Sequence, residues 1–232
     1  MRPDYRPLSA VGLNAQAILD IDALPEATRE RLAAAVDLSP WRRIVLIANT
    51  GPELWRAVQA AGVGGAHPID DFSIDTVGRW WSGHAGGARC LRLYPDGAPI
   101  DLQALGRAVG WHHDSPLKIG IHPVWGTWFG YRVALLTDAP WTPTPPEAGD
   151  VPCLRCEAPP CRAACPAGAV GADGLDLPAC LRFRTQPDSP CARTCLARLA
   201  CPAGVAYRYD EAQIRHSYGD SLQAIRHFGL PG

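Results

Sequence analysis

The sequence has little charge, almost no lysine and no long apolar run, and each shortage excludes a class of protein. Charged residues are 19% of 232, Lys118 is the only lysine, and 22 basic residues face 23 acidic ones, a net charge of −1. This balance gives no electrostatic excess for a polyanion, so we expect no nucleic-acid partner. No run of 18 apolar residues suits a transmembrane helix. The N-terminus also lacks the pattern of a secretory signal. We therefore expect a cytoplasmic protein without a membrane partner.

Cysteine is scarce before residue 150 and dense after it. Cys90 is the only cysteine in the first 150 residues, whereas eight of the nine lie between Cys153 and Cys201. A disulfide framework needs an oxidising compartment, and nothing in the sequence directs export. Clustered cysteines in a cytoplasmic chain instead indicate metal or redox chemistry. Cys90 lies on an apolar segment, where a lone cysteine is usually a small core residue, and we assign it no role.

Proline-rich residues 141–150 predict a semi-rigid linker between two domains, which we place at residues 1–140 and 151–208, with a helical tail at 209–232. Before the linker, signals for strands and helices alternate, which predicts a mixed α/β domain. The expected helices are 25–36, 54–61, 70–81 and 102–109, and the expected strands are 43–48, 90–94, 119–121 and 127–136. In the tail we expect one helix capped at Asp210 and another from Ser221 to Phe228.

The cysteine-rich segment has few large apolar side chains and needs an inorganic centre to fold. Its two runs are C-x2-C-x4-C-x3-C-P and C-x10-C-x3-C-x5-C-P. They resemble bacterial two-cluster ferredoxins, in which the fourth cysteine of each run binds the other cluster. Two 4Fe–4S clusters are thus expected, one on Cys153, Cys156, Cys161 and Cys201, the other on Cys165, Cys180, Cys191 and Cys195. Zinc in a four-thiolate site is the alternative. Ten residues separate Cys180 from the next cysteine of its run, the longest gap within either run. Without Cys180 the second site would have three thiolates.

Aromatic residues and glycines gather in the segment 119–138. Such flat faces, with glycine clearance and a few polar anchors, suit a large planar ligand, although a core strand is the simpler interpretation. The stretch GIHPVWGTWFGYR, residues 120–132, resembles the signature of the CblC-type cobalamin-processing proteins (the MMACHC family). The order GTWFGYRVALLTD, a proline-rich link and then Cys153 is also similar to the junction in epoxyqueuosine reductases.

These resemblances imply a nitroreductase-like α/β (α+β) domain that binds cobalamin, followed by a bacterial-ferredoxin-like domain. By position, the residues expected at the corrin are His122, Trp125, Gly126, Trp128, Phe129 and Arg132. YPDGAP, residues 94–99, resembles the segment that carries the proton donor of epoxyqueuosine reductases, which makes Asp96 the candidate acid. A turn residue before Gly97 is the alternative for Asp96. For His122 the alternative is a cap of the strand. The pair His112–His113 is expected as solvated imidazoles.

The combined expectation is a cobalamin reductase that removes the upper ligand of a corrinoid, with electrons supplied through the two clusters. Its expected partners are the corrinoid and an electron-donating reductase, flavodoxin or ferredoxin. A homodimer is left open. A second hypothesis is epoxyqueuosine-reductase-like chemistry on tRNA, against which we set the net charge and the end of the sequence at Gly232 without a long helical extension. A third is a non-catalytic protein, either an electron carrier or a cobalamin chaperone.

Overall fold

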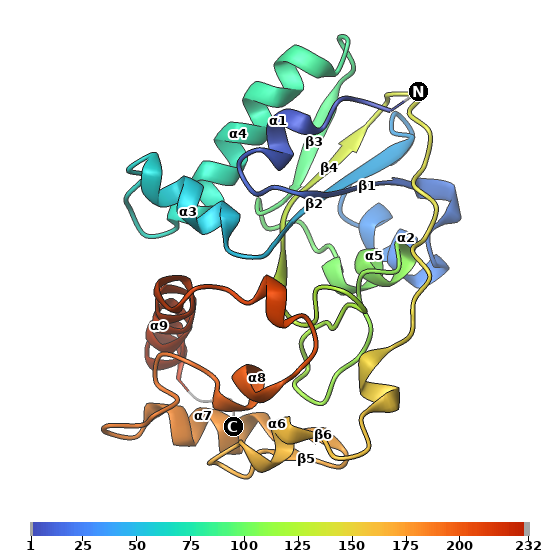
Figure 1. Cartoon of the computed structure of the whole chain (residues 1–232). Coiled ribbons are helices and arrows are strands. Elements are labelled where there is room, and N and C mark those ends of the chain that lie inside the picture. Colours follow the sequence, from blue (N-terminus) through green and yellow to red (C-terminus); the bar gives the residue numbers. More distant parts are fainter. Residues whose placement is uncertain (1, 230–232) are drawn as a thin grey trace. The chain divides into compact units, whose positions relative to one another are not determined.

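The computed structural model describes residues 2–229, which form two compact units (Figure 1). Unit 1 extends from the N-terminus to His112 and resumes at Phe129–Gly149. Unit 2 contains His113–Trp128 and the chain from Asp150 onward. The predicted boundaries divide the chain differently, because they place residues 113–128 in the first domain and treat the tail separately.

Unit 1 is built on a four-stranded antiparallel sheet with the strand order β1-β2-β4-β3. The strands are β1 (Ala15–Asp20), β2 (Arg43–Thr50), β3 (Cys90–Tyr94) and β4 (Phe129–Thr137). In the central strand β2, every residue after Arg43 is buried, as expected for an apolar run covered on both faces. Because its neighbours are antiparallel, the carboxyl end of β2 and the amino end of β4 lie at the same end of the sheet.

Helices pack their apolar sides onto this sheet. They are α1 (Arg6–Ser9), the 3₁₀ turn η1 (Ile21–Ala23), α2 (Glu26–Ala33), α3 (Glu53–Ala60), α4 (Pro68–His84) and α5 (Leu102–Ala108). Side chains of α1, α3 and α4, Leu54 and Trp80 among them, form one core with Ile18, Val45 and Val133 of the sheet. The helices α2 and α5 are neighbours in Figure 1, away from α3 and α4. Arg31 of α2 forms an ion pair at 3.6 Å with Asp101, the residue that precedes α5.

Unit 2 consists of short elements with little apolar core. They are η2 (Pro152–Arg155), α6 (Pro160–Ala163), β5 (Val170–Gly171), β6 (Gly174–Leu175), α7 (Leu177–Thr185), α8 (Leu196–Ala200), η3 (Val205–Tyr207) and α9 (Glu211–Phe228). One small cluster surrounds Leu117 and Val170, and another surrounds Trp128 and Tyr209. Within the described part of the chain, no helix combines the length and apolarity needed to cross a bilayer.

Most of the elements predicted from the sequence are confirmed, with three corrections across the two units. The segment 119–121 forms single bridges, His113 with Ile121 and His122 with Gly126, and no strand. The tail is one continuous helix, α9, capped by Asp210 as predicted. The proline-rich segment belongs to unit 1, since Thr144 exchanges hydrogen bonds with the backbone of Ile18 at 2.7 and 3.0 Å.

Candidate functional site

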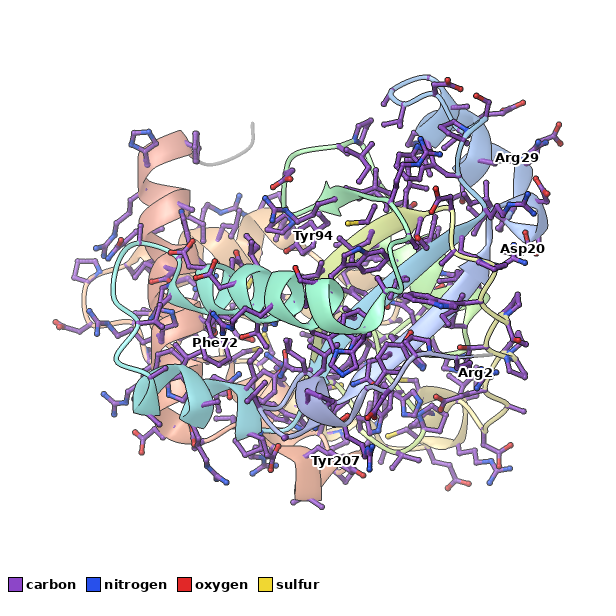
Figure 2. All side chains as sticks on the ribbon, turned by 90° about the horizontal axis from the view of Figure 1, so that it is seen from above. Arg2, Asp20, Arg29, Phe72, Tyr94 and Tyr207 are labelled. Atoms are coloured by element: carbon purple, nitrogen blue, oxygen red, sulfur yellow. The ribbon has the colours of Figure 1, made fainter. Side chains whose placement is uncertain are left out.

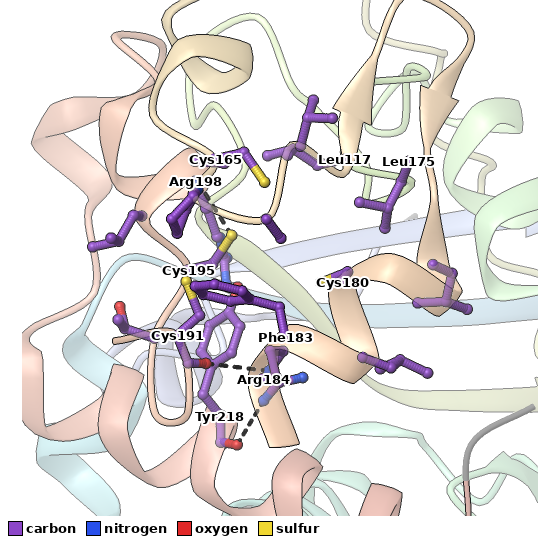
Figure 3. Close-up of a pocket in the computed structure, with 18 of the residues that line it drawn as sticks. Leu117, Cys165, Leu175, Cys180, Phe183, Arg184, Cys191, Cys195, Arg198 and Tyr218 are labelled. Carbon is purple, nitrogen blue, oxygen red and sulfur yellow. Dashed lines mark hydrogen bonds between the residues drawn. The ribbon is translucent and has the colours of Figure 1, made fainter. Parts of the chain in front are cut away.

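The eight clustered cysteines line two cavities in unit 2. One cavity, of about 210 Å³, is lined by what we call the first cysteine group: Cys153, Cys156, Cys161 and Cys201. The other, of about 200 Å³, is lined by the second cysteine group: Cys165, Cys180, Cys191 and Cys195 (Figure 3). All eight are free of disulfides. The structure thus brings together the same two sets that the resemblance to two-cluster ferredoxins implies, Cys180 included.

The chain crosses between the groups at the two Cys-Pro steps. Cys165 ends the first cysteine run but lines the cavity of the second group, and Cys201 ends the second run but lines the cavity of the first. Each is followed by a proline, Pro166 or Pro202. Since proline cannot continue a helix, the short helices α6 and α8 stop just before these steps, and each last sulfur lies away from its own run.

The thiols within a group influence one another. Burial raises the pKa of Cys153 above its ordinary 9.0, and the other three members of the first group raise it further. Burial likewise raises the pKa of Cys180, with contributions from the rest of the second group. The pKa values of Cys161 and Cys191 are also raised, with burial as the largest cause. Without a metal these thiols hold their protons at neutral pH, so any metal that binds them as thiolates would displace those protons.

Each cavity offers four sulfur donors, the number that a 4Fe–4S cluster requires. Among the described residues, no three His, Cys, Asp or Glu side chains approach closely enough to hold one metal ion. A 4Fe–4S cluster binds its four thiolates through different irons, so they surround a core larger than one ion. Apolar residues such as Leu117 and Val170 line the second cavity beside the sulfurs, which limits the access of water.

Four of the residues predicted at a corrin lie in unit 2, and two of them serve the local backbone. Nδ1 of buried His122 accepts hydrogen bonds from the amides of Val124 and Trp125 at 3.1 and 3.2 Å, so it caps this turn. The ring of Trp125 stacks on His122 with centroids 3.7 Å apart. A Cβ on Gly126, whose φ is +58°, would lie 2.1 Å from the carbonyl oxygen of Ala203. The missing side chain makes room for the protein's own backbone.

Trp128 is a core residue of unit 2. Its side chain is 0% exposed and packs edge-on against Tyr209, with ring centroids 5.5 Å apart. The guanidinium of Arg198 lies over the indole, 4.3 Å from the ring centroid. The indole therefore has no open face for the corrin contact that the resemblance implies.

Phe129 and Arg132 lie in unit 1, at the end of the sheet where β2 finishes and β4 begins. Nε of Arg132 donates to Oδ1 of buried Asn49 at 2.7 Å, and Nη1 lies 3.8 Å from the carboxylate of Asp70 on α4. A Cβ on Gly130 would be only 2.9 Å from Nη2 of Arg132. This glycine therefore provides the space in which the guanidinium is held, with one edge positioned by an amide and a carboxylate.

The rings beside Arg132 are partly enclosed. Phe129 packs edge-on against Tyr131 with centroids 5.7 Å apart. The Tyr131 hydroxyl is buried without a hydrogen-bond partner among the described residues, and burial raises its pKa. Tyr94, labelled in Figure 2, ends β3 at this same end of the sheet. Burial and the nearby Asp70 raise the pKa of Tyr94, while Arg132 opposes the shift.

Asp96 lies two residues beyond β3 and is partly exposed. Its carboxylate accepts a hydrogen bond from Nε of Arg92 at 2.8 Å. The next residue, Gly97, has a φ of +79°, which is typical of the tight turn that the sequence offered as the alternative. The structure thus supports the turn and leaves the role of Asp96 as an acid a prediction.

The sequence gives no indication of several candidate residues. Asn49 and Asp70 position Arg132 but lie far before it in the sequence. The only sequence signals for them are that Asn49 follows the predicted strand 43–48 and that Asp70 begins the predicted helix 70–81. Arg184 and Arg198 line the second cavity without any motif. His112 is 4% exposed, so the expected solvated imidazole is wrong at that position. Cys90 is exposed on the edge strand β3 and is not the core residue expected.

No protein-family model and no curated protein matches the sequence. The fold, however, matches solved structures of epoxyqueuosine reductase. A selenomethionine-labelled one has a TM-score of 0.55 at 14% identity, covering 87% of this chain and 64% of that protein. One with an epoxyqueuosine-modified tRNA stem loop has a TM-score of 0.55 at 15% identity, covering 90% and 66%. The C. elegans B12-trafficking protein CblC reaches only 0.45 at 14% identity, covering 91% and 89%, too weak to carry an argument.

The chain thus shares the mixed α/β fold of the epoxyqueuosine reductases over most of its length. It spans about 64% of the length of the selenomethionine-labelled reductase. At this identity the likeness concerns the fold, and function rests on the residues themselves.

Proposed function

We propose that this chain is an iron–sulfur oxidoreductase that passes electrons from two 4Fe–4S clusters to a bound corrinoid, whose upper axial ligand is then released. The observation that carries the proposal is the division of eight cysteines between two cavities, four in each. Two cavities of nearly equal volume, each with four free thiols, match the requirement of a two-cluster electron path. The fold shared with the epoxyqueuosine reductases supports the oxidoreductase class.

The residues that would hold each group differ in kind. The first and second cysteine groups would bind the clusters through their thiolates. Arg132 would donate to amide side chains of the corrinoid, and Phe129 would contact its planar ring. When bound, the clusters supply one-electron transfer and the corrinoid supplies a cobalt whose bond to the upper ligand weakens on reduction. A reductase, flavodoxin or ferredoxin would provide the electrons.

The protein's own contribution is to position groups and to exclude water. Asn49 fixes the guanidinium of Arg132 in one orientation, and the absence of a side chain at Gly130 leaves it room. Burial around Leu117 and Val170 keeps the second cysteine group away from bulk solvent. Asp96 is exposed and accepts a hydrogen bond from Nε of Arg92, which holds its carboxylate in place.

The proposal is tested by reconstituting the chain anaerobically with iron and sulfide and then titrating it with cyanocobalamin. We expect about eight irons per chain. We also expect saturable binding of cyanocobalamin, measured by equilibrium dialysis. Iron binding without corrinoid binding contradicts the corrinoid part and leaves an electron carrier. Corrinoid binding without release of the upper ligand on reduction indicates a chaperone instead.

Activity on epoxyqueuosine in tRNA is the second candidate, because one structure that shares this fold is that of an epoxyqueuosine reductase with a modified tRNA stem loop. The net charge of −1 gives no general attraction to phosphates. A gel-shift titration with an epoxyqueuosine-modified stem loop separates the two functions. Binding that weakens steeply with salt would favour the tRNA substrate over a free corrinoid.

A further inference from the structure

The cavity of the second cysteine group contains a buried positive charge that no carboxylate neutralises. Arg184 is 7% exposed and lines this cavity. Its guanidinium donates to the carbonyl oxygens of Cys191 and Tyr218 at 3.3 and 3.0 Å (Figure 3), and to Oγ of Ser221 at 3.2 Å. These neutral partners satisfy its hydrogen bonds but leave its charge unbalanced.

A second arginine lines the same cavity. Arg198 donates to the Thr127 hydroxyl at 3.3 Å, and its guanidinium stacks over Trp128. Its backbone amide donates to Sγ of Cys195 at 3.4 Å (Figure 3). Throughout residues 2–229, no carboxylate lies within ion-pair distance of Arg184 or Arg198.

The cavity of the first cysteine group has a different charge. Its charged lining residues are Glu157 and Arg162, which are of opposite sign and both exposed. Solvent therefore screens them. The backbone amides of Arg162 and of Cys161 itself donate to the sulfur of Cys161. The two cavities are alike in volume and in ligands but not in the charge around them.

A buried guanidinium without a counter-charge is costly, and an anion in the same cavity would offset that cost. A 4Fe–4S cluster bound by four thiolates has a net negative charge, which grows by one on reduction. Nearby positive charge and hydrogen bonds to sulfur favour the reduced state, because both stabilise added negative charge in a medium of low dielectric constant. Arg184 places one buried guanidinium at this cavity and Arg198 lines it as well, whereas the charged side chains that line the first cavity are exposed.

We infer that the second cysteine group holds the cluster of higher reduction potential, and that Arg184 and Arg198 set this order. The inference rests on the proposed function, since it requires both clusters. Electrons that enter at the first group would then collect at the second. Both arginines act on the cluster through their positive charge, and neither binds iron.

The test is an EPR-monitored redox titration of the fully reconstituted chain. We expect two one-electron signals at different potentials. Cys180→Ala should remove the signal of higher potential, and Cys156→Ala should remove the other. Arg184→Gln should lower the higher potential by at least 59 mV, a tenfold fall in the ratio of reduced to oxidised cluster at a fixed potential. Arg162→Gln, at the first cavity, should leave that higher potential unchanged.

Arg184→Lys separates charge from packing, because it keeps the positive charge and should retain most of the higher potential. Iron analysis of every variant distinguishes a lost cluster from a shifted potential. Two clusters of equal potential, or a higher potential assigned to the first group, would overturn the inference while leaving the proposed function standing. An Arg184→Gln variant with an unchanged higher potential would also overturn the inference and leave the proposed function standing. A chain that binds no iron would overturn both.

Discussion

Gly126 lies directly against the backbone of Ala203, two residues after Cys201, so closely that neither segment could carry another atom between them. A Cβ at Gly126 would be 2.1 Å from the Ala203 carbonyl oxygen, and one at Gly204 would be 2.2 Å from the Trp125 carbonyl carbon. This contact joins the aromatic segment to the last cysteine of the first group.

Replacement of Gly126 by alanine should therefore destabilise unit 2. The positive φ and the close contact together cost about 2–4 kcal/mol, to be measured by denaturant unfolding of the iron-loaded chain. Gly219→Ala is the matched control: Gly219 lies within α9, with nothing within 4 Å of a Cβ. That variant should gain about 1 kcal/mol. Equal stability of the two variants would show that the contact with Ala203 is unimportant.

Loss of one cysteine from each group should remove one cluster and leave the other. Cys156→Ala and Cys180→Ala should each retain about four irons per chain, as expected when one 4Fe–4S centre remains. Cys90→Ala should retain the full content, because Cys90 lies on β3 in unit 1. Full iron content in Cys180→Ala would mean that this residue is not a ligand, and loss of all iron from both variants would mean that the clusters do not assemble independently.

Arg132→Gln should weaken binding of cyanocobalamin by about ten- to a hundredfold, the range expected for one charge-assisted hydrogen bond. The control is Arg89→Gln, because Arg89 pairs with Asp138 at the opposite end of the sheet, beyond the pairing of Cys90 with Thr137. The Arg89→Gln variant should bind cyanocobalamin with the same affinity as the unmodified chain. If both variants bind alike, the corrinoid does not contact this end of unit 1.

The iron-free chain should lose stability as the pH rises above about 9. Burial raises the folded-state pKa of Cys153, Cys161, Cys180 and Cys191 above their ordinary 9.0. Below that value the thiols are protonated in both states and their contribution is complete; at higher pH the unfolded chain loses protons first, and the contribution disappears.

The iron-loaded chain is the control for this pH effect, since its cysteines are held as thiolates. Burial also raises the pKa of Tyr5 and Tyr131, which lowers stability at high pH in both forms. Urea midpoints measured from pH 8 to 10.5 should therefore fall more steeply without iron. Parallel curves for the two forms would contradict the assignment of these cysteines as ligands.

The features that can be predicted best from the sequence are those that depend on spacing. The Cys-Pro steps at Cys165 and Cys201 resemble those of two-cluster ferredoxins, and this resemblance implies the crossing between groups because ligand order and a chain-redirecting proline are local features. Local patterns fail where the signal itself is weak. The strand β1 is not predicted, because the alternation from Ala15 to Ala17 is short and Ile18 and Leu19 break it.

Nothing local shows that Trp128 packs against Tyr209 in unit 2 while its neighbour Phe129 begins a strand of unit 1. The charge around the second group is equally hidden in the sequence. Arg184 follows Cys180 within α7, yet its position in the cavity depends on contacts with Tyr218 and Ser221 of α9. Such a role follows from tertiary contacts, to which no motif points.

The most direct test of the central claim is electron transfer from reduced clusters to a corrinoid within the intact chain. The reconstituted protein is reduced with dithionite, freed of the reductant under anaerobic conditions and mixed with cyanocobalamin, and its visible spectrum is recorded. We predict that the cyanide-bound corrin bands disappear and free cyanide appears while the clusters become oxidised. If the clusters stay reduced and the corrin spectrum does not change, the claim of electron transfer to the corrinoid is contradicted.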